Sequence, residues 1–278
     1  MQRPISEPTH PEIAAIQAML CKVDGLHLPI ASRREVESIL VRQVSDQLDR
    51  ALPCQSGHGR RTATTALRIG RAVGLSAGQL HDLELAALLH DIGLLMLPAN
   101  LIKFHDHLKP ESYIVVQNHS RLGAALLEPF SFLRQASIFI AHHHERWDGS
   151  GYPYGVRGEF IPVGSRILAI ADAYDAIKVP KVSDPVVRNL IALRILRVAS
   201  GTQFDPRLTA IAAETMLNKF RQEETPGLDR KGGGWLKGLA KLSQYPQTGF
   251  EMGACPPTSW AGPSLPPEAP RPPFLLSE

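Results

Sequence analysis

Ionisable side chains interrupt helical segments that are otherwise almost entirely apolar, and this pattern limits how the chain can fold. The groups are His90 and Asp91 after the run 83–89, Asp172 within 167–174, and His143 with His144 after 138–141. An apolar helix has to bury its surface. Burying an ionisable group without a partner costs several kcal/mol. Something in the core of the folded chain must therefore compensate these groups.

The body of the chain is predicted to be all-α. Between residues 57 and 221 helical patterns follow one another, separated by short breakers, and alternating β-type runs are few. Helices are expected over 33–52, 60–73, 77–92, 112–127, 132–145, 164–177, 184–200 and 206–221, with the glycine-rich segment 148–158 as a loop. We expect an N-terminal helical extension in 1–52, a helical bundle in 53–222, and a disordered, low-complexity Gly/Pro-rich tail in 223–278.

Composition and charge exclude several classes of protein. Lys and Arg total 30 against 27 Asp and Glu, and this net charge of +3 is too small to indicate binding to DNA, RNA or a membrane surface. Three widely separated cysteines do not fit a disulfide framework and agree with a reducing compartment. The N-terminus lacks the apolar stretch of a signal peptide, and no run of about 18 apolar residues occurs. We expect a soluble, cytoplasmic protein.

Two explanations of the buried ionisable groups stay open at this point. In the first, each group is a core polar side chain that a neighbour satisfies. In the second they bind metal, because with His58 and His119 they make five imidazoles and two carboxylates, which are hard to satisfy with one another. Imidazole and carboxylate suit Fe, Mn, Zn or Co, and a carboxylate can bridge two ions. A ligand set without cysteine favours a catalytic, water-retaining site over a closed structural zinc site.

At these residues the chain resembles a known family. The doublet His90-Asp91 is similar to the signature of the HD superfamily of metal-dependent phosphohydrolases. The segment 143–153, HHERWDGSGYP, is similar to the HHExxDGxGYP signature of its HD-GYP branch. His58, the helix around Asp172 and the segment GTQFDP at 201–206 fit the same resemblance, which covers residues 57–221 in order.

The resemblance implies a compact helical bundle whose core holds two divalent metal ions, iron or manganese. It also implies hydrolysis of cyclic di-GMP to pGpG, with further hydrolysis to GMP left open. Two adjacent cations lower the pKa of a bridging water, so that a hydroxide can attack phosphorus in line. Asp91 and His90 would be catalytic. One ion would be held by His58, His90, Asp91 and Asp172, and the other by Asp91, His119, His143 and His144.

The resemblance also implies roles for residues around the metal set. The loop residues Gly151, Tyr152 and Pro153, together with Lys181, are expected to contact the substrate. The side chains of Glu145 and Asp148 are expected to orient the metal-binding imidazoles. The loop is further expected to contact diguanylate cyclase (GGDEF) partners, and analogy with such proteins indicates a homodimer.

Four positions depart from the family pattern. Cys54 stands where three-metal members have Glu, which favours a two-metal site. Leu94 replaces a Lys that contacts the substrate phosphate, and Lys181 and Asp184 stand at an Arg and a Lys position. The lost positive charge leaves an alternative open, a degenerate HD-GYP domain that senses cyclic di-GMP or serves as a protein-interaction scaffold with little or no turnover. A third possibility is an HD phosphohydrolase that acts on another cyclic dinucleotide or nucleotide.

Overall fold

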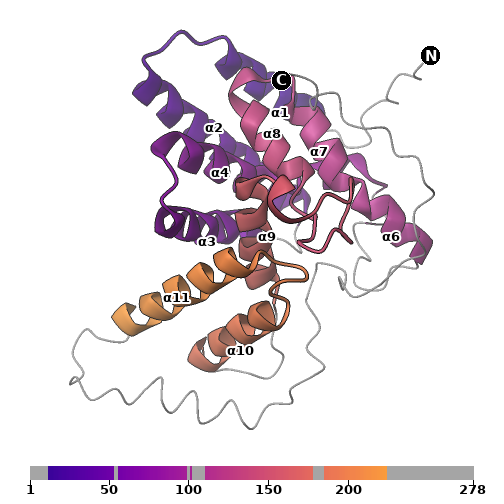
Figure 1. Cartoon of the computed structure of the whole chain (residues 1–278). Helices are drawn as coiled ribbons and strands as arrows, with labels where there is room; N and C mark the ends of the chain where they lie inside the picture. Colours follow the sequence, from indigo (N-terminus) through magenta and orange to yellow (C-terminus); the bar gives the residue numbers. More distant parts are fainter. Residues whose placement is uncertain (1–11, 53–55, 99–100, 102–109, 178–184, 224–278) are drawn as a thin grey trace, which may run out of the picture.

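Apolar residues at helical spacing produce helices throughout the described part of the chain (Figure 1). The computed structural model describes residues 12–52, 56–98, 101, 110–177 and 185–223. The α-helices are α1 (Glu12–Asp24), α2 (Ile30–Ala51), α3 (His58–Val73), α4 (Ala77–Leu89), α6 (Pro110–Gln117), α7 (His119–Leu127), α8 (Arg134–Ala141), α9 (Val163–Ala176), α10 (Pro185–Val198) and α11 (Pro206–Glu223). Short 3-10 helices are η2 (Ile92–Met96), η4 (Ser131–Leu133) and η5 (Gly158–Phe160). No β-strand occurs within these ranges, so the all-α prediction is confirmed.

Several predicted features fall outside the described residues. They are Cys54, Lys181, Asp184 and the tail from residue 224 onward. Within the part of the chain that is described, no helix combines the length and the hydrophobicity needed to cross a membrane.

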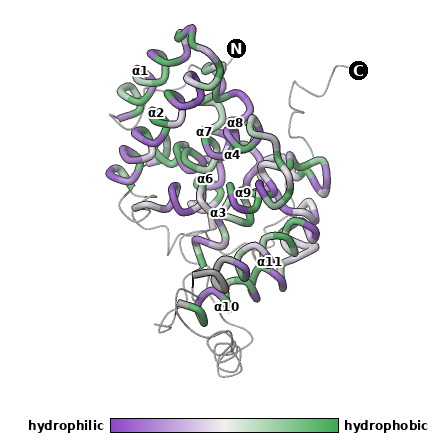
Figure 2. Tube along the Cα trace, turned by 90° about the vertical axis from the view of Figure 1, so that its left-hand side faces the viewer, coloured by the Kyte–Doolittle hydropathy of each residue, from purple (hydrophilic) through white to green (hydrophobic). Residues whose placement is uncertain are grey.

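Helix α4 forms the centre of the fold. Its buried residues are Leu83, Leu85, Ala86, Ala87, Leu88 and Leu89. The part of α4 from Leu85 to Leu89 is apolar on all sides and is stable only when other elements cover it, and α2, α3, α8 and α9 pack against α4. Figures 1 and 2 place α1 and α2 at one end of the molecule and α10 and α11 at the other, so α4 and α9 lie between them.

Local chemistry sets the boundary between α3 and α4. Gly74 ends α3 in the left-handed region at φ +87°, which glycine adopts without strain. Ser76 begins α4 with a capping box, because its hydroxyl accepts the N–H of Gln79 while the Gln79 side chain accepts the N–H of Ser76. The short connection makes α3 and α4 neighbours, and it brings His58 at the start of α3 beside His90 at the end of α4.

The helix predicted over 112–127 is two helices, and the break lies at Asn118. The Asn118 side-chain amide donates to Ile114 O at 3.1 Å, and its backbone N–H donates to Val115 O at 3.2 Å, three residues back. Asparagine competes in this way for the carbonyls that an α-helix would use. Similar breaks end α4 at Leu89 and α8 at Ala141, earlier than predicted. Each break leaves a histidine at a helix end.

An additional helix, α1, precedes the single N-terminal helix that was predicted. It buries Ile13, Ile16, Leu20 and Val23, which are spaced three or four residues apart, and it packs against α2. A helix of 13 residues is marginal on its own. Packing against α2 therefore stabilises α1.

Two glycines allow η2 and α7 to approach closely. A Cβ at Gly93 would collide with the carbonyl oxygen of His119 and lie 2.6 Å from Gly123 N. Only glycine permits so close a backbone approach. This contact places the N-terminus of α7, with His119, beside the end of α4.

Replacing Gly93 with Ala should therefore displace α7 and destabilise the protein. The added Cβ meets backbone atoms that cannot rotate away, so we expect the free energy of unfolding to fall by about 2 kcal/mol or more. Urea unfolding followed by circular dichroism measures the change. Gly25→Ala is the matched control, because no atom lies within 4 Å of a Cβ at Gly25. Equal stability of the two variants would contradict the close approach of η2 and α7.

Candidate metal centre

The fold gathers six of the seven predicted metal ligands into two groups of three. The first group is His58, His90 and Asp172, from α3, the end of α4, and α9; the second is His119, His143 and His144, from α7 and the turn after α8. Within each group the ligand atoms all lie within 4.8 Å of one another. The seventh predicted ligand, Asp91, lies between the groups.

The first group is compact and buried. His58 Nε2 lies 3.1 Å from Asp172 Oδ1 and 3.2 Å from His90 Nε2. His90 Nε2 lies 3.8 Å from the same Asp172 oxygen. His90 and Asp172 are both buried. Three ligand atoms from three different helices thus face one small volume.

Asp91 directs one carboxylate oxygen to each group. Its Oδ2 lies 3.2 Å from His90 Nε2 and 3.9 Å from His58 Nε2. Its Oδ1 lies 3.5 Å from His119 Nε2, in the second group. Asp91 thus lies between the two groups with one oxygen toward each, and its role as a bridging ligand stays a prediction.

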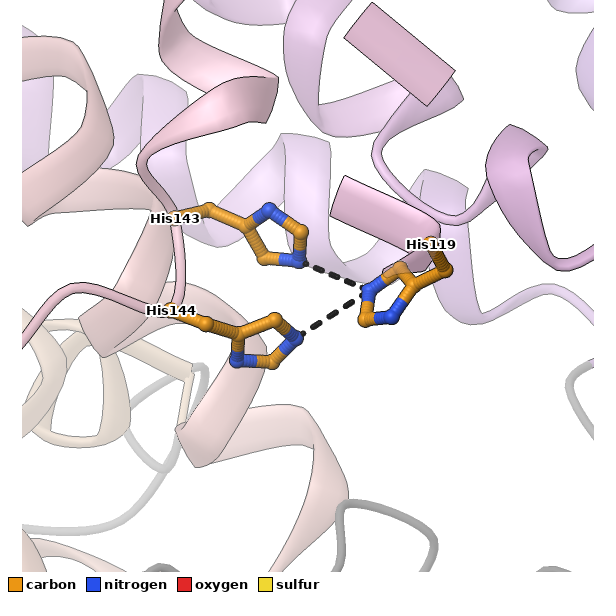
Figure 3. Close-up of side chains that lie close together, drawn as sticks. All are labelled: His119, His143 and His144. Carbon is orange, nitrogen blue, oxygen red and sulfur yellow. Dashed lines mark hydrogen bonds between the residues drawn. The ribbon is translucent and has the colours of Figure 1, made fainter. Parts of the chain in front are cut away.

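The second group consists of three imidazoles that point toward one another (Figure 3). His119 Nε2 lies 3.4 Å from His143 Nε2 and 3.2 Å from His144 Nε2. His119 comes from the start of α7, whereas His143 and His144 come from the turn that follows α8. The end of α8 at Ala141 allows two consecutive histidines to face the same point.

The hydrogen bonds of the Nδ1 atoms determine which nitrogen of these imidazoles carries the proton. His119 Nδ1 donates to Val116 O at 2.8 Å, and His143 Nδ1 donates to Ile140 O at 2.6 Å. A neutral ring with a proton on Nδ1 has a lone pair on Nε2. The Nε2 lone pairs of His119 and His143 therefore face each other, an arrangement that is repulsive unless a cation lies between them. Neutral imidazole is the form that binds divalent metals.

The charges of the two groups differ. Burial, and then the neighbouring imidazoles, hold the pKa values of His143 and His144 well below the usual range, so these rings are neutral. Burial also lowers the pKa of His58, but hydrogen bonds to Asp172 and Asp175 outweigh it and raise this pKa to about 10. Burial raises the pKa of Asp91, yet His90 beside it brings the net value well below the usual range. The second group therefore offers neutral imidazoles, whereas the carboxylates of the first group favour the protonated form of His58, and a divalent cation that binds there would replace this proton.

Asp175 is a residue of the site that the sequence prediction missed. Its Oδ2 accepts a hydrogen bond from His58 Nδ1 at 2.7 Å, and Arg61 donates to both of its carboxylate oxygens. A carboxylate behind a ligating imidazole fixes the ring and raises its basicity. The spacing of Asp172 and Asp175 on one helix was the available signal, since residues three apart lie on the same face.

A cleft opens beside the metal ligands. Gly151 and Tyr152 of the predicted substrate loop line it, together with His143, His144 and Asp172. The Tyr152 ring stacks on His144, with the ring centroids 4.9 Å apart and the planes at 28°. Pro153 follows Tyr152 through a cis peptide bond. The structure thus brings the loop to the site, whereas Lys181 lies outside the described residues.

Glu145 and Asp148 both contact the loop. Glu145 is buried, and its Oε1 accepts the N–H of Tyr154 at 2.7 Å; burial raises its pKa to about 7. Asp148 accepts hydrogen bonds from the backbone and hydroxyl of Ser150. These contacts shape the loop that carries Tyr152. The direct role toward the imidazoles that was expected of Glu145 and Asp148 stays a prediction.

Comparison with known proteins agrees with this geometry. A profile described as HD domain matches residues 42–208. The cyclic di-GMP phosphodiesterase response regulator RpfG of Xanthomonas campestris pv. campestris is 33% identical over 184 residues, which cover 64% of this chain and 48% of that protein. The 3'3'-cGAMP-specific phosphodiesterase 2 of Vibrio cholerae is 28% identical over 184 residues, 65% of this chain and 35% of that protein. Among solved structures, Bd1817, an HDG"Y"P protein from Bdellovibrio bacteriovorus, is 17% identical with a TM-score of 0.51, covering 74% of this chain and 70% of that one.

These similarities concern part of each curated relative, because the chain spans about half of RpfG and about a third of the Vibrio protein. The domain boundaries predicted after residues 52 and 222 stay predictions. The likeness to Bd1817 supports the helical fold. The resemblance to the HD superfamily and its HD-GYP branch is confirmed, and the chain belongs to the HD domain family.

Proposed function

We propose that this chain is a metal-dependent phosphodiesterase that hydrolyses cyclic di-GMP to pGpG. Asp91 carries the proposal, because its two carboxylate oxygens face two separate groups of ligands. The substrate class is supported by the relatives named as cyclic di-GMP and cyclic GMP-AMP phosphodiesterases. The cleft beside the ligands is lined by Tyr152 of the glycine-rich loop and by Arg146, which gives a substrate access to the ligand groups.

The proposed centre contains two divalent ions, iron or manganese, which would supply a hydroxide near neutral pH and neutralise charge on the phosphate. One would be held by His58, His90, Asp91 and Asp172, and the other by Asp91, His119, His143 and His144. Burial of His90, His119, His143 and Asp172 among apolar helices strengthens the electrostatic interactions of these side chains. Tyr152 stacks on the His144 ring and limits its rotation.

Arg146 is the proposed partner of the substrate phosphates. It lines the cleft, and Ser150 Oγ accepts from its Nε at 2.9 Å while Asp148 accepts from its Nη2 at 3.4 Å. A guanidinium can pair with phosphate through two parallel hydrogen bonds. Leu94, at the family's Lys position, instead packs partly buried against the hydrophobic core. This loss of a cation is the observation that favours the alternative function, a sensor or scaffold without turnover.

The loop also carries the partner predictions. Gly151, Tyr152 and Pro153 stay proposed substrate contacts, with Lys181. Phe160, in η5 beyond the loop, is 85% exposed, which fits a surface that a diguanylate cyclase could contact. A homodimer and a cytoplasmic location stay part of the proposal.

Metal content tests the two-ion centre. Protein purified anaerobically with iron or manganese should contain two ions per chain, measured by inductively coupled plasma mass spectrometry. His119→Ala should lose one ion, because it removes a ligand of one group, whereas Asp91→Ala should lose most of both. His27→Ala is the control, since His27 is exposed and far from the groups in sequence. Metal-free wild type, or full content in His119→Ala, would contradict the proposed centre.

Turnover separates the enzyme from the sensor. The metal-loaded protein is incubated with cyclic di-GMP and the products are separated by chromatography. We expect pGpG, and we expect Asp91→Ala to reduce the rate at least about 100-fold because the two ligand groups lose their shared oxygen donor. Tight binding of cyclic di-GMP without product over hours would support the sensor and overturn the proposed enzyme.

Asp175 should support metal binding through His58. Asp175→Asn removes the carboxylate charge behind the His58 imidazole, so we expect metal affinity to fall about 10- to 100-fold in chelator competition. Asp46→Asn is the matched control, because Asp46 pairs with Arg60 at an exposed position of α2. Equal metal affinity in the two variants would show that Asp175 has no such role.

A further inference from the structure

The two ends of the glycine-rich loop meet at Trp147. The carbonyl oxygen of Trp147 accepts the N–H of Gly158 at 3.0 Å, so the loop closes at this residue. The Trp147 N–H donates to Gln203 O at 3.1 Å. The N–H of the next residue, Asp148, donates to Thr202 O at 2.8 Å. Gln203 and Thr202 lie in the turn between α10 and α11, so the backbone of this turn holds the loop.

A buried carboxylate fixes the same turn. Asp205 is 4% exposed and immediately precedes α11. Its Oδ1 accepts the N–H of Arg207 at 2.8 Å and that of Leu208 at 3.2 Å, which caps the first turn of α11. Its other oxygen, Oδ2, accepts a hydrogen bond from Arg166 Nη1 at 2.7 Å. Because Arg166 belongs to α9, one carboxylate joins the α10–α11 turn to α9.

The guanidinium of Arg166 also meets the loop. Its Cζ lies 5.8 Å from the centroid of the Trp147 ring. A cation within about 6 Å of an aromatic ring centroid is attracted to the ring. The contacts of Arg166, Asp205, Gln203 and Trp147 thus form a closed circuit, which we call the Arg166 cluster. A shift of one of these residues disturbs the others.

The Arg166 cluster lies between two parts of the proposed active site. Trp147 directly follows Arg146, which lines the cleft and is the proposed phosphate partner. On α9, Arg166 precedes the proposed ligand Asp172 by six residues, which is about 9 Å along a helix axis. Neither Arg166 nor Trp147 is among the described residues that line the cleft. An effect of either on the substrate would therefore pass through a neighbour.

We propose that Arg166 is a positioning residue, which holds Arg146 at the cleft through contact with Trp147 and so raises the affinity for the substrate. This inference rests on the proposed phosphodiesterase function and adds to that site a residue outside the cleft wall. An interaction that the substrate makes equally in the ground state and the transition state affects KM and leaves kcat unchanged. Arg166 should therefore act on KM.

Two conservative variants loosen the Arg166 cluster without removing a side chain. A guanidinium bonds a carboxylate along one edge while its flat face covers an aromatic ring, whereas an ammonium has no flat face. Arg166→Lys should therefore keep a charge beside Asp205 and release Trp147. Asparagine caps helices about as well as aspartate, so Asp205→Asn should keep the start of α11 and weaken the pair with Arg166.

The test measures kcat and KM for cyclic di-GMP with the metal-loaded full chain. In both variants KM should rise roughly five- to tenfold while kcat stays within about twofold of wild type. Metal content should stay at two ions per chain, because no proposed ligand has changed. Arg207→Lys is the matched control, since it makes the same substitution at an exposed position of α11 and should leave KM unchanged.

A double-mutant cycle with Arg146→Ala separates positioning from a general structural role. A residue that acts through Arg146 has no further effect once that side chain is absent. The KM of Arg146→Ala/Arg166→Lys should therefore lie within about twofold of the KM of Arg146→Ala alone. Additive effects on KM would show that Arg166 does not act through Arg146, and they overturn the inference. Circular dichroism checks the folding of each variant, and Asp205→Asn replaces Arg166→Lys in the cycle if the latter does not fold.

The Kd for cyclic di-GMP distinguishes failure of this inference from failure of the proposed function. Unchanged KM in both variants overturns the inference and leaves the proposed function standing, and so does loss of metal or of kcat in both. A wild type that binds cyclic di-GMP without cleaving it overturns the proposed function, and the same cycle in Kd then decides the role of Arg166. A wild type that neither binds nor cleaves cyclic di-GMP overturns both.

Discussion

Imidazole nitrogens that face one another in a buried site are the constraint on which the rest of the structure depends. In the second ligand group the rings of His119 and His143 are held with Nδ1 bonded to a carbonyl and Nε2 directed inward. In this orientation the Nε2 lone pairs of the two neutral rings face each other across 3.4 Å, which is repulsive. A cation between the rings would bind both lone pairs and remove the repulsion. Burial, and then the neighbouring imidazoles, hold the pKa values of His143 and His144 well below the usual range, so a proton does not take the place of that cation. The fold therefore brings neutral imidazole donors to one point, which is the arrangement that a divalent cation requires.

The same local arrangement holds three of the ligands. The Nδ1 atoms of His90, His119 and His143 each donate to the carbonyl three residues earlier, at Ala87, Val116 and Ile140. A helix end leaves several carbonyls without an intrahelical donor. The histidine that follows the end of α4, α6 or α8 by one or two residues donates to one of the last carbonyls and in doing so turns its other nitrogen toward the centre. The same hydrogen bond thus caps the helix end and orients the ligand. A continuous helix would not place these imidazoles toward the centre.

This event explains what the sequence could predict and what it could not. Apolar periodicity predicted the helices around the ligands, and the histidines and aspartates within them predicted the two groups that the structure brings together. Periodicity does not register a break such as the one at Asn118, because side-chain competition for backbone carbonyls leaves the apolar spacing unchanged. Asp175 was missed for another reason: its role depends on contact with His58 from a distant segment. Helix α1 was missed because its stability comes from packing against α2.

Because the metal ligands and the cleft wall are different residues, the absence of the family's lysine at position 94 is expected to affect substrate binding and not the ligand set. Leu94 packs against the core and belongs to neither group of ligands. Interactions that a substrate makes equally in the ground and transition states affect KM, whereas those at the reacting phosphorus affect kcat. A phosphate contact at the cleft wall belongs to the first kind, and the two ligand groups with Asp91 belong to the second. A chain with this ligand set and this cleft wall is therefore expected to bind its substrate weakly while it keeps the arrangement that the chemistry requires.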